Sequence, residues 1–193
     1  MPFTNQTLDK RSTILCATLE LLASQGFHGF SVKQLAQKAG VATGTVYLHF
    51  KDREDLIRQL YLEVVHEVGK HLFVDLDASA SAEDQYRQIC RNFWRFCLIN
   101  HDILSCKAQF DHLPSDIRRI QSNESKQIIL PLYQVFAMGR ERGEIKHLPD
   151  DVLVTLAIEP FSSLANKQWL GLVNLDEAAL EQVINACWDA IAQ

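Results

Sequence analysis

The chain has 193 residues, 47% of them hydrophobic, which allows a substantial core and excludes a disordered protein. No apolar run reaches the roughly 18 residues of a membrane span, and residues 1–10 lack the apolar stretch of a signal peptide, so we expect a soluble cytoplasmic protein. The net charge of −5 divides into +3 over residues 1–51 and −8 over the rest, which favours different partners for the two parts.

Apolar residues recur at spacings of three and four along nearly the whole chain, without strand-like alternation. The sequence therefore predicts an all-α protein of about nine helices. In chain order they are expected over residues 9–25, 32–39, 43–49, 53–73, 83–99, 101–111, 115–142, 150–170 and 176–192. Ser31 and Asp52 are expected N-caps, and Pro131 should bend the seventh helix by removing a backbone donor.

The sharpest pattern lies in residues 31–50, SVKQLAQKAGVATGTVYLHF. Two short helices are joined by Ala39-Gly40-Val41, which supplies a small residue for close helix approach, a glycine for the corner and an apolar plug. Two short helices joined by such a turn form a helix-turn-helix. The turn alone also occurs in ordinary helical hairpins, so it does not by itself establish DNA binding.

The residues around this turn resemble the TetR family of bacterial transcriptional regulators. Positions in register with the family's pattern are Ala36, Ala39, Gly40, Val41, Gly44, Tyr47, His49, Phe50 and Leu56. The chain departs from the pattern at Ser31, Leu35 and Arg53, and at Ala42, where serine often caps the second helix. The resemblance implies a helix-turn-helix DNA-binding domain over residues 8–68 and a ligand-binding and dimerisation domain over residues 69–193, with the fourth helix shared.

A recognition helix enters the major groove of DNA and presents the residues near its N-terminus to base edges. Candidates for base contacts are therefore Thr43, Thr45 and Val46, and Gly44 permits close approach to the duplex. Candidates for phosphate contacts, which fix the register of the protein on DNA, are Tyr47, His49 and Lys51, joined by Ser31, Val32 and Lys33 of the preceding helix.

Some residues of this helix also have a purely structural interpretation. Because Val46, Leu48 and Phe50 follow one another at every second position, we expect Phe50 and also Leu48 to lie in the core. The ring of Tyr47 can pack as well as contact DNA. No second histidine lies at helical ligand spacing from His49, so no metal site is predicted there.

The TetR resemblance further implies a small-molecule effector bound by the C-terminal domain. Aromatic side chains there are candidates for lining a pocket for a flat or lipophilic molecule, although aromatics at helical spacing are more often core. Glu159 interrupts an apolar run, and its carboxylate could meet a cationic ligand, a subunit interface or solvent. The candidate set is Phe93, Trp94, Phe110, Tyr133, Phe136, Glu159 and Phe161.

The last two predicted helices are more apolar than an outer layer requires, which favours a homodimer over packing within one chain. The expected interface residues are Leu153, Leu156, Leu164, Leu180, Val183, Ile184, Cys187, Trp188 and Ile191. A two-fold axis would place two recognition helices in successive major grooves, so the expected DNA partner is a double-stranded, near-palindromic operator.

The predicted function is a DNA-binding transcriptional regulator, a repressor released by its ligand, with activation left open. One alternative is a helical protein-interaction module without DNA binding, but such a module has no reason to keep Lys33, Tyr47 and Lys51. An enzyme is a weaker alternative, since the chain has no GxSxG, glycine-rich phosphate loop or HExxH motif, and no cofactor is expected. The five cysteines never form CxxC, which favours reduced thiols over a redox pair.

Overall fold

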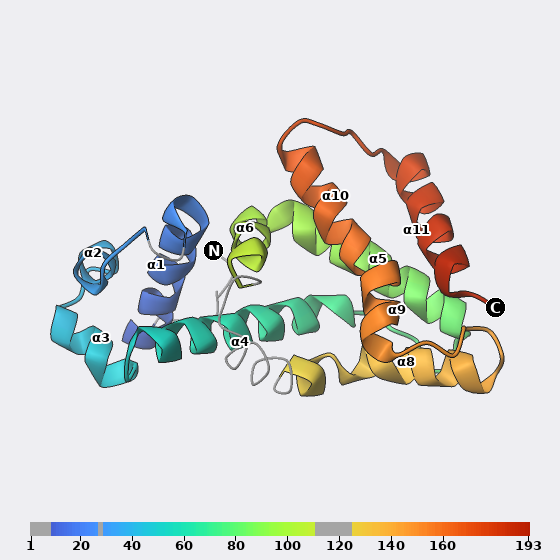
Figure 1. Ribbon diagram of the computed structural model, residues 1–193, viewed down its shortest axis with the longest axis horizontal. Helices are drawn as coiled ribbons and strands as arrows, with labels where there is room; N and C mark the ends of the chain where they lie inside the picture. The colour runs from blue at the N-terminus through green and yellow to red at the C-terminus, as the bar shows by residue number, and fades with distance from the viewer. Residues whose placement is uncertain (1–8, 27–28, 111–124) are drawn as a thin grey trace. The chain divides into compact units, whose positions relative to one another are not determined.

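The computed structural model describes residues 9–26, 29–110 and 125–193, apart from the side chains of residues 107–109, and this part of the chain is helical without strands (Figure 1). The all-α prediction is therefore confirmed. The helices are α1 (Lys10–Gln25), α2 (Val32–Lys38), α3 (Thr43–His49), α4 (Arg53–Leu72), α5 (Ala82–Ile99), α6 (His101–Phe110), α8 (Leu130–Glu141), α9 (Asp150–Ala157), α10 (Glu159–Trp169) and α11 (Glu177–Ile191). No helix in these ranges is long and apolar enough to cross a membrane.

Side-chain caps fix where several of these helices begin. Asp9, Ser81 and Asp176 accept hydrogen bonds from backbone N–H groups in the first turns of α1, α5 and α11. Ser31 and Gln34 form a reciprocal capping box at the start of α2. Each cap satisfies a backbone donor that the helix leaves unpaired, and aspartate and serine are residue types that commonly cap helices.

Two prolines divide the C-terminal part more sharply than the sequence analysis predicts. The helix expected over residues 150–170 is broken at Ile158 into α9 and α10, because Pro160 lacks the N–H that would continue the ladder. Pro131 lies in the first turn of α8, where a missing N–H is harmless, so it begins a helix rather than bending one. The expected start of the seventh helix, near residue 115, lies outside the described residues.

The chain forms two compact units, one of residues 1–67 with 102–126 and one of residues 68–101 with 127–193. The boundary between residues 67 and 68 falls inside α4. The described residues 102–110 and 125–126 group with the first unit, although they were predicted to belong to the C-terminal domain. Contacts far apart in sequence explain the difference: Cys106 Sγ donates to Leu19 O at 3.4 Å, and the rings of Tyr61 and Phe110 meet edge to face.

The first unit is built around α1, which packs against α2 and α3. Its fully buried side chains come from α1, α2, α4 and the residue that follows α3, and they include Ile14, Leu22, Leu35, Phe50 and Leu60. Burial of this apolar surface holds two short helices that would be unstable alone.

The second unit is built around α5, with α8, α10 and α11 against it (Figure 1). Tyr86 lies at its centre: its hydroxyl donates to Ala157 O at 3.1 Å and its ring lies 5.2 Å from that of Trp188. Burial raises the pKa of the Tyr86 hydroxyl, so it stays a neutral donor. The bond ties α5 to the end of α9, where the proline break frees a carbonyl.

Candidate DNA-binding surface and a cleft in the second unit

The α3 helix is anchored from beneath by two apolar side chains. Val46 and Phe50 are 2% and 1% exposed, and they lie one turn apart on the same face of the segment. The opposite face carries Tyr47, 55% exposed, and Leu48, 84% exposed. The core therefore fixes which face of α3 is presented to solvent.

Most of the predicted DNA contacts are exposed to solvent. The side chains of Thr43, Tyr47, His49 and Lys51 are exposed, as are Ser31 and Lys33 of α2, together with Gly44; Thr45 and Val32 are half-buried. The prediction for Val46 is wrong. It was expected to contact bases, but its side chain is part of the core and faces away from the exposed surface.

The prediction for Leu48 is also wrong, but here the side chain is exposed rather than buried. It was expected in the core and is instead the most exposed large apolar side chain of the described residues. Single exposed leucines are common on protein surfaces, but at this position of a helix that enters the major groove a leucine can contact a thymine methyl group.

Polar contacts fix α2 and the start of α4 around this surface. Lys38 Nζ on α2 lies 2.7 Å from Glu20 Oε2 on α1. Arg53 Nη1 donates to Phe30 O at 2.7 Å, and its guanidinium lies 4.5 Å from the centre of the Phe30 ring. These bonds join the entry of α2 to the first turn of α4, so α2 and α3 are held from both ends.

The turn and the first residues of α3 leave the surface unobstructed. Gly40 has φ +66°, a left-handed conformation that glycine adopts without strain, and a Cβ built on Gly44 meets no atom within 4 Å. Ala42 is the N-cap of α3 and provides no side-chain cap, as its residue type requires. Another surface can therefore approach the backbone of α3 closely.

The predicted effector residues do not form one cluster. Phe136 and Phe161 are fully buried, and Trp94 and Phe110 are nearly so, which places them in the core; Phe110 belongs to the first unit and the other three to the second. Phe93, Tyr133 and Glu159 are half-buried. Of the seven, only Trp94 lines the cleft described next.

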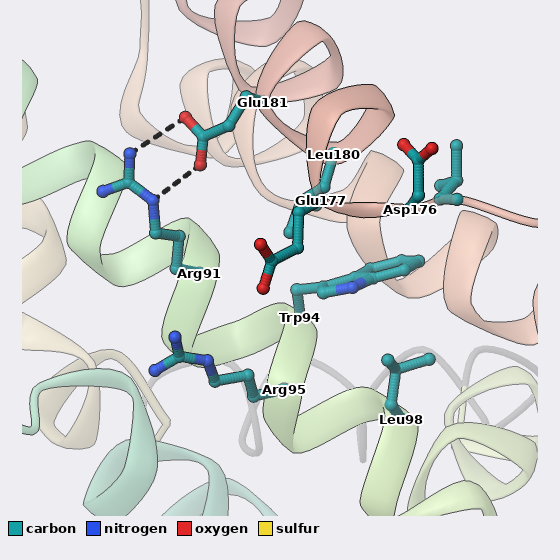
Figure 2. Close-up of a pocket in the computed structure, with 9 residues that line it drawn as sticks. Arg91, Trp94, Arg95, Leu98, Asp176, Glu177, Leu180 and Glu181 are labelled. Atoms are coloured by element: carbon teal, nitrogen blue, oxygen red, sulfur yellow. Dashed lines mark hydrogen bonds and ion pairs between the residues drawn. The ribbon is translucent and has the colours of Figure 1, made fainter.

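The second unit has a cleft of about 680 Å³ between α5 and α11, which we call the α5–α11 cleft. Arg91, Trp94, Arg95 and Leu98 of α5 form one side, and residues 175–177 with Leu180 and Glu181 form the other (Figure 2). Its volume is typical of small-molecule sites, which are commonly 300–1,000 Å³. Trp94 was predicted from the sequence to contact the effector, but the charged residues were not, because they belong to two helices about 90 residues apart.

One ion pair closes part of this cleft. Arg91 donates to both carboxylate oxygens of Glu181, from Nε at 2.7 Å and from Nη2 at 2.9 Å, as the dashed lines in Figure 2 mark. Hydrogen bonding from Arg91 holds the pKa of the Glu181 carboxyl below its usual range, so the pair is charged at neutral pH. Such two-point pairing fixes the spacing of α5 and α11 at this level.

The predicted dimer residues divide into two groups. Leu153, Leu180, Ile184, Cys187, Trp188 and Ile191 are buried by the chain itself, which corrects the expectation that they face a partner. Leu164 and Val183 are half-buried, and Leu156 is exposed. Val152, one turn before Leu156 on α9, is also exposed and was missed by the sequence analysis.

The five cysteines are all buried and free. Burial raises the pKa of the Cys97 and Cys106 thiols to about 12, so neither forms a reactive thiolate at neutral pH. Among the described residues no group of His, Cys, Asp and Glu side chains is arranged to hold a metal ion.

Comparison with known proteins gives two family matches. Residues 14–60 match the model described as "Bacterial regulatory proteins, tetR family", and residues 82–192 match the model described as "Tetracyclin repressor-like, C-terminal domain". The two matches together include α2, α3 and the whole of the α5–α11 cleft.

Individual relatives align over almost their full lengths. An uncharacterised HTH-type transcriptional regulator from Haemophilus influenzae is 32% identical over 95% of this chain and 96% of its own. The fatty acid metabolism regulator protein of Bacillus subtilis is 27% identical over 93% and 96%. The solved structure of a putative TetR-family regulator from Vibrio parahaemolyticus superimposes with a TM-score of 0.85 at 32% identity, covering 96% of this chain and 100% of that one.

Proposed function

The chain belongs to the TetR family of bacterial transcriptional regulators, and from this premise we propose that it represses transcription by binding a near-palindromic operator and is released by a small-molecule effector. Its relatives are transcriptional regulators rather than enzymes. DNA binding through the helix-turn-helix and regulation of transcription are properties of the family; the operator form and the direction of control are our proposal.

The observation that carries the proposal is the exposed face of α3. Tyr47 and Leu48 extend from a helix whose other face is fixed in the core by Val46 and Phe50. Such a rigid, uncovered helix has the geometry that major-groove recognition requires. Lys33 and Lys51 flank it with positive charge, which attracts phosphate despite the negative charge of the whole chain.

We propose that the operator is read by a homodimer formed through the outer faces of α9 to α11. Val152 and Leu156 lie one turn apart on the outer face of α9, and both are exposed in a single chain. Apolar side chains spaced in this way gain burial when a second copy covers them. The interface therefore uses the exposed members of the predicted set rather than its buried ones.

The effector is expected to be lipophilic or aromatic. The second unit is rich in apolar and aromatic side chains, and one relative is named for its role in fatty acid metabolism. We propose that the effector acts through α4, a continuous helix that contributes residues to both units. A change in α4 that alters the spacing of paired α3 helices needs a coupling of only about 1–3 kcal/mol for useful control.

The direct test is binding of fluorescently labelled genomic fragments to the wild-type protein and to a Tyr47→Ala, Lys51→Ala variant. Wild-type affinity should fall steeply with salt, because phosphate contacts release counterions. The variant should lose most of its affinity at equal helical content by circular dichroism. Arg142→Ala, which removes an exposed charge at the end of α8 and outside α9 to α11, is the control and should bind as the wild type does. Unchanged binding by the double variant would overturn the assignment of α3.

A further inference from the structure

A ladder of three facing polar pairs runs between α5 and α11 and ends in the α5–α11 cleft; two of the pairs are bonded and the third is not. On α5, Arg87, Arg91 and Arg95 follow one another at intervals of four residues; on α11, Asn185, Glu181 and Glu177 do so in the reverse direction. Residues four apart lie on the same face of a helix, so each of these arginines on α5 has one counterpart on α11.

The first two levels of this ladder are bonded. Arg87 Nη1 donates to Asn185 Oδ1 at 2.6 Å, and Arg91 pairs with Glu181 through two hydrogen bonds. At the third level, the described residues provide no hydrogen bond or ion pair between Arg95 and Glu177. The α5–α11 cleft lies at this level, and Figure 2 shows the Glu177 carboxylate directed into it, with Arg95 one turn along α5 from Arg91.

An apolar wall lies beside the open pair. Trp94, 5% exposed, and Leu180, 9% exposed, line the cleft together with Leu98. An indole face attracts cations as well as apolar groups. The site thus offers a cation-binding group, an anion-binding group and an apolar surface within one cavity.

We propose that the α5–α11 cleft binds an amphipathic zwitterion, whose anionic group pairs with Arg95, whose ammonium group pairs with Glu177 beside Trp94, and whose apolar part packs on Leu98 and Leu180. The charges around the cleft favour this class. A simple cation meets repulsion from Arg91 and Arg95, and a simple anion meets repulsion from Asp176 and Glu177, whereas a zwitterion satisfies both sides. The proposal concerns ligand binding alone and does not depend on DNA binding.

Three probes share a decyl chain and differ in the charge of the headgroup, so they separate the contribution of the headgroup to affinity from that of the tail. They are a decyl dimethylammonio-propanesulfonate, decyltrimethylammonium and decyl sulfonate. Each is titrated by calorimetry below its micelle concentration into the full chain. The zwitterionic probe should bind most tightly, by roughly three- to tenfold over each singly charged probe. Equal affinities of all three would show a merely apolar site, and a tighter anion or cation would show a site of a single charge; each result overturns the proposal.

Two variants test the assigned partners. Arg95→Gln should weaken binding of the zwitterionic probe and strengthen binding of the cationic probe. Glu177→Gln should weaken binding of the zwitterionic probe and strengthen binding of the anionic probe. The opposite responses to the singly charged probes cannot arise from general destabilisation, which would weaken all three. Lys167→Gln and Glu141→Gln, both exposed and outside the cleft, are the charge-matched controls and should leave every affinity unchanged. Loss of all three probes in either cleft variant, or no change in either, would contradict the assignment.

Discussion

Gly44 occupies a position on α3 where an added methyl group meets no protein atom within 4 Å. We predict that Gly44→Ala raises the free energy of unfolding by about 0.5–1 kcal/mol, because alanine favours helix over glycine. The same methyl group lies on the exposed face of α3, so DNA affinity should fall about tenfold, or ~1.4 kcal/mol. Urea unfolding and fluorescence anisotropy with genomic DNA measure the two effects. A variant that is stabilised and still binds DNA fully would show that DNA does not approach this part of α3.

The cysteines predict a second result at the residue scale. All five are buried, so at pH 8 they should react with a thiol reagent roughly a hundredfold more slowly in the native protein than in urea. Two cysteines that react rapidly in the native protein would instead support a redox pair.

The raised thiol pKa values also give a pH dependence. Cys97 and Cys106 have pKa values near 12 in the folded chain against about 9 when unfolded, so the folded state binds more protons between these values. Their contribution to stability is complete below pH 9 and is lost as the pH rises toward 12. Urea midpoints should therefore fall over this interval, and Cys97→Ala should make the fall less steep.

The sequence predicts individual residues well where their periodicity is read correctly. Ser31, Phe50 and Asp52 hold the places expected of them: Ser31 accepts from Gln34 N, Asp52 accepts from Asp55 N, and Phe50 is buried. Leu48 was misjudged because alternate positions were treated as one face. On a helix, residue 48 is about 200° from residue 46, so Val46 and Leu48 must point to opposite sides. A stricter use of the helical repeat would have identified Leu48 as an exposed residue.

At the scale of elements, the turn between α2 and α3 depends on Gly40. Its φ of +66° costs an L-residue about 1–2 kcal/mol, and no side chain is near enough to add a clash. Gly40→Ala should therefore lower the free energy of unfolding by that amount, the opposite sign to Gly44→Ala. The two variants control for each other, since both make the same chemical change. If Gly40→Ala were as stable in urea as the wild type, the turn would not be held in the left-handed conformation.

Element boundaries follow from local sequence wherever a cap marks them, as at Asp9, Ser81 and Asp176. The division of α9 from α10 was not predicted, although Pro160 lies at the start of α10 and indicates it. A run of apolar residues across the proline suggested one helix, but the missing N–H decides the local geometry. The ladder between α5 and α11 was not predictable at this scale, because it needs the register of two separate helices.

At the scale of the whole molecule, we predict a dimer that depends on α9. Changing Val152 and Leu156 together to aspartate places charge on an apolar surface that a partner would cover, so sedimentation should show a monomer with unchanged helical content. Val74→Asp, at an exposed apolar position outside α9 to α11, should remain dimeric. A wild-type monomer at micromolar concentration, or a dimer in the double variant, would place the interface elsewhere.

The division of the chain into two units could not be predicted from the sequence. Residues 102–110 join the first unit through contacts such as Cys106 with Leu19 and Tyr61 with Phe110, which link positions 87 and 49 residues apart. No local pattern encodes such contacts. The family and the helix-turn-helix, in contrast, were predictable from residues 31–56, since the spacing of Gly40, Gly44, Tyr47 and Phe50 is local.

The central claim is that the exposed face of α3 reads DNA and that a symmetric dimer presents it twice. Selection of bound sequences from random DNA tests both parts, using the wild type and a Thr43→Ala, Leu48→Ala variant. The wild type should enrich an inverted repeat whose half-sites are centred about 10 base pairs, or a multiple of this, apart. The variant should keep this spacing and lose base preference within each half-site. No enriched sequence from the wild type, or an unaltered motif from the variant, would contradict the account.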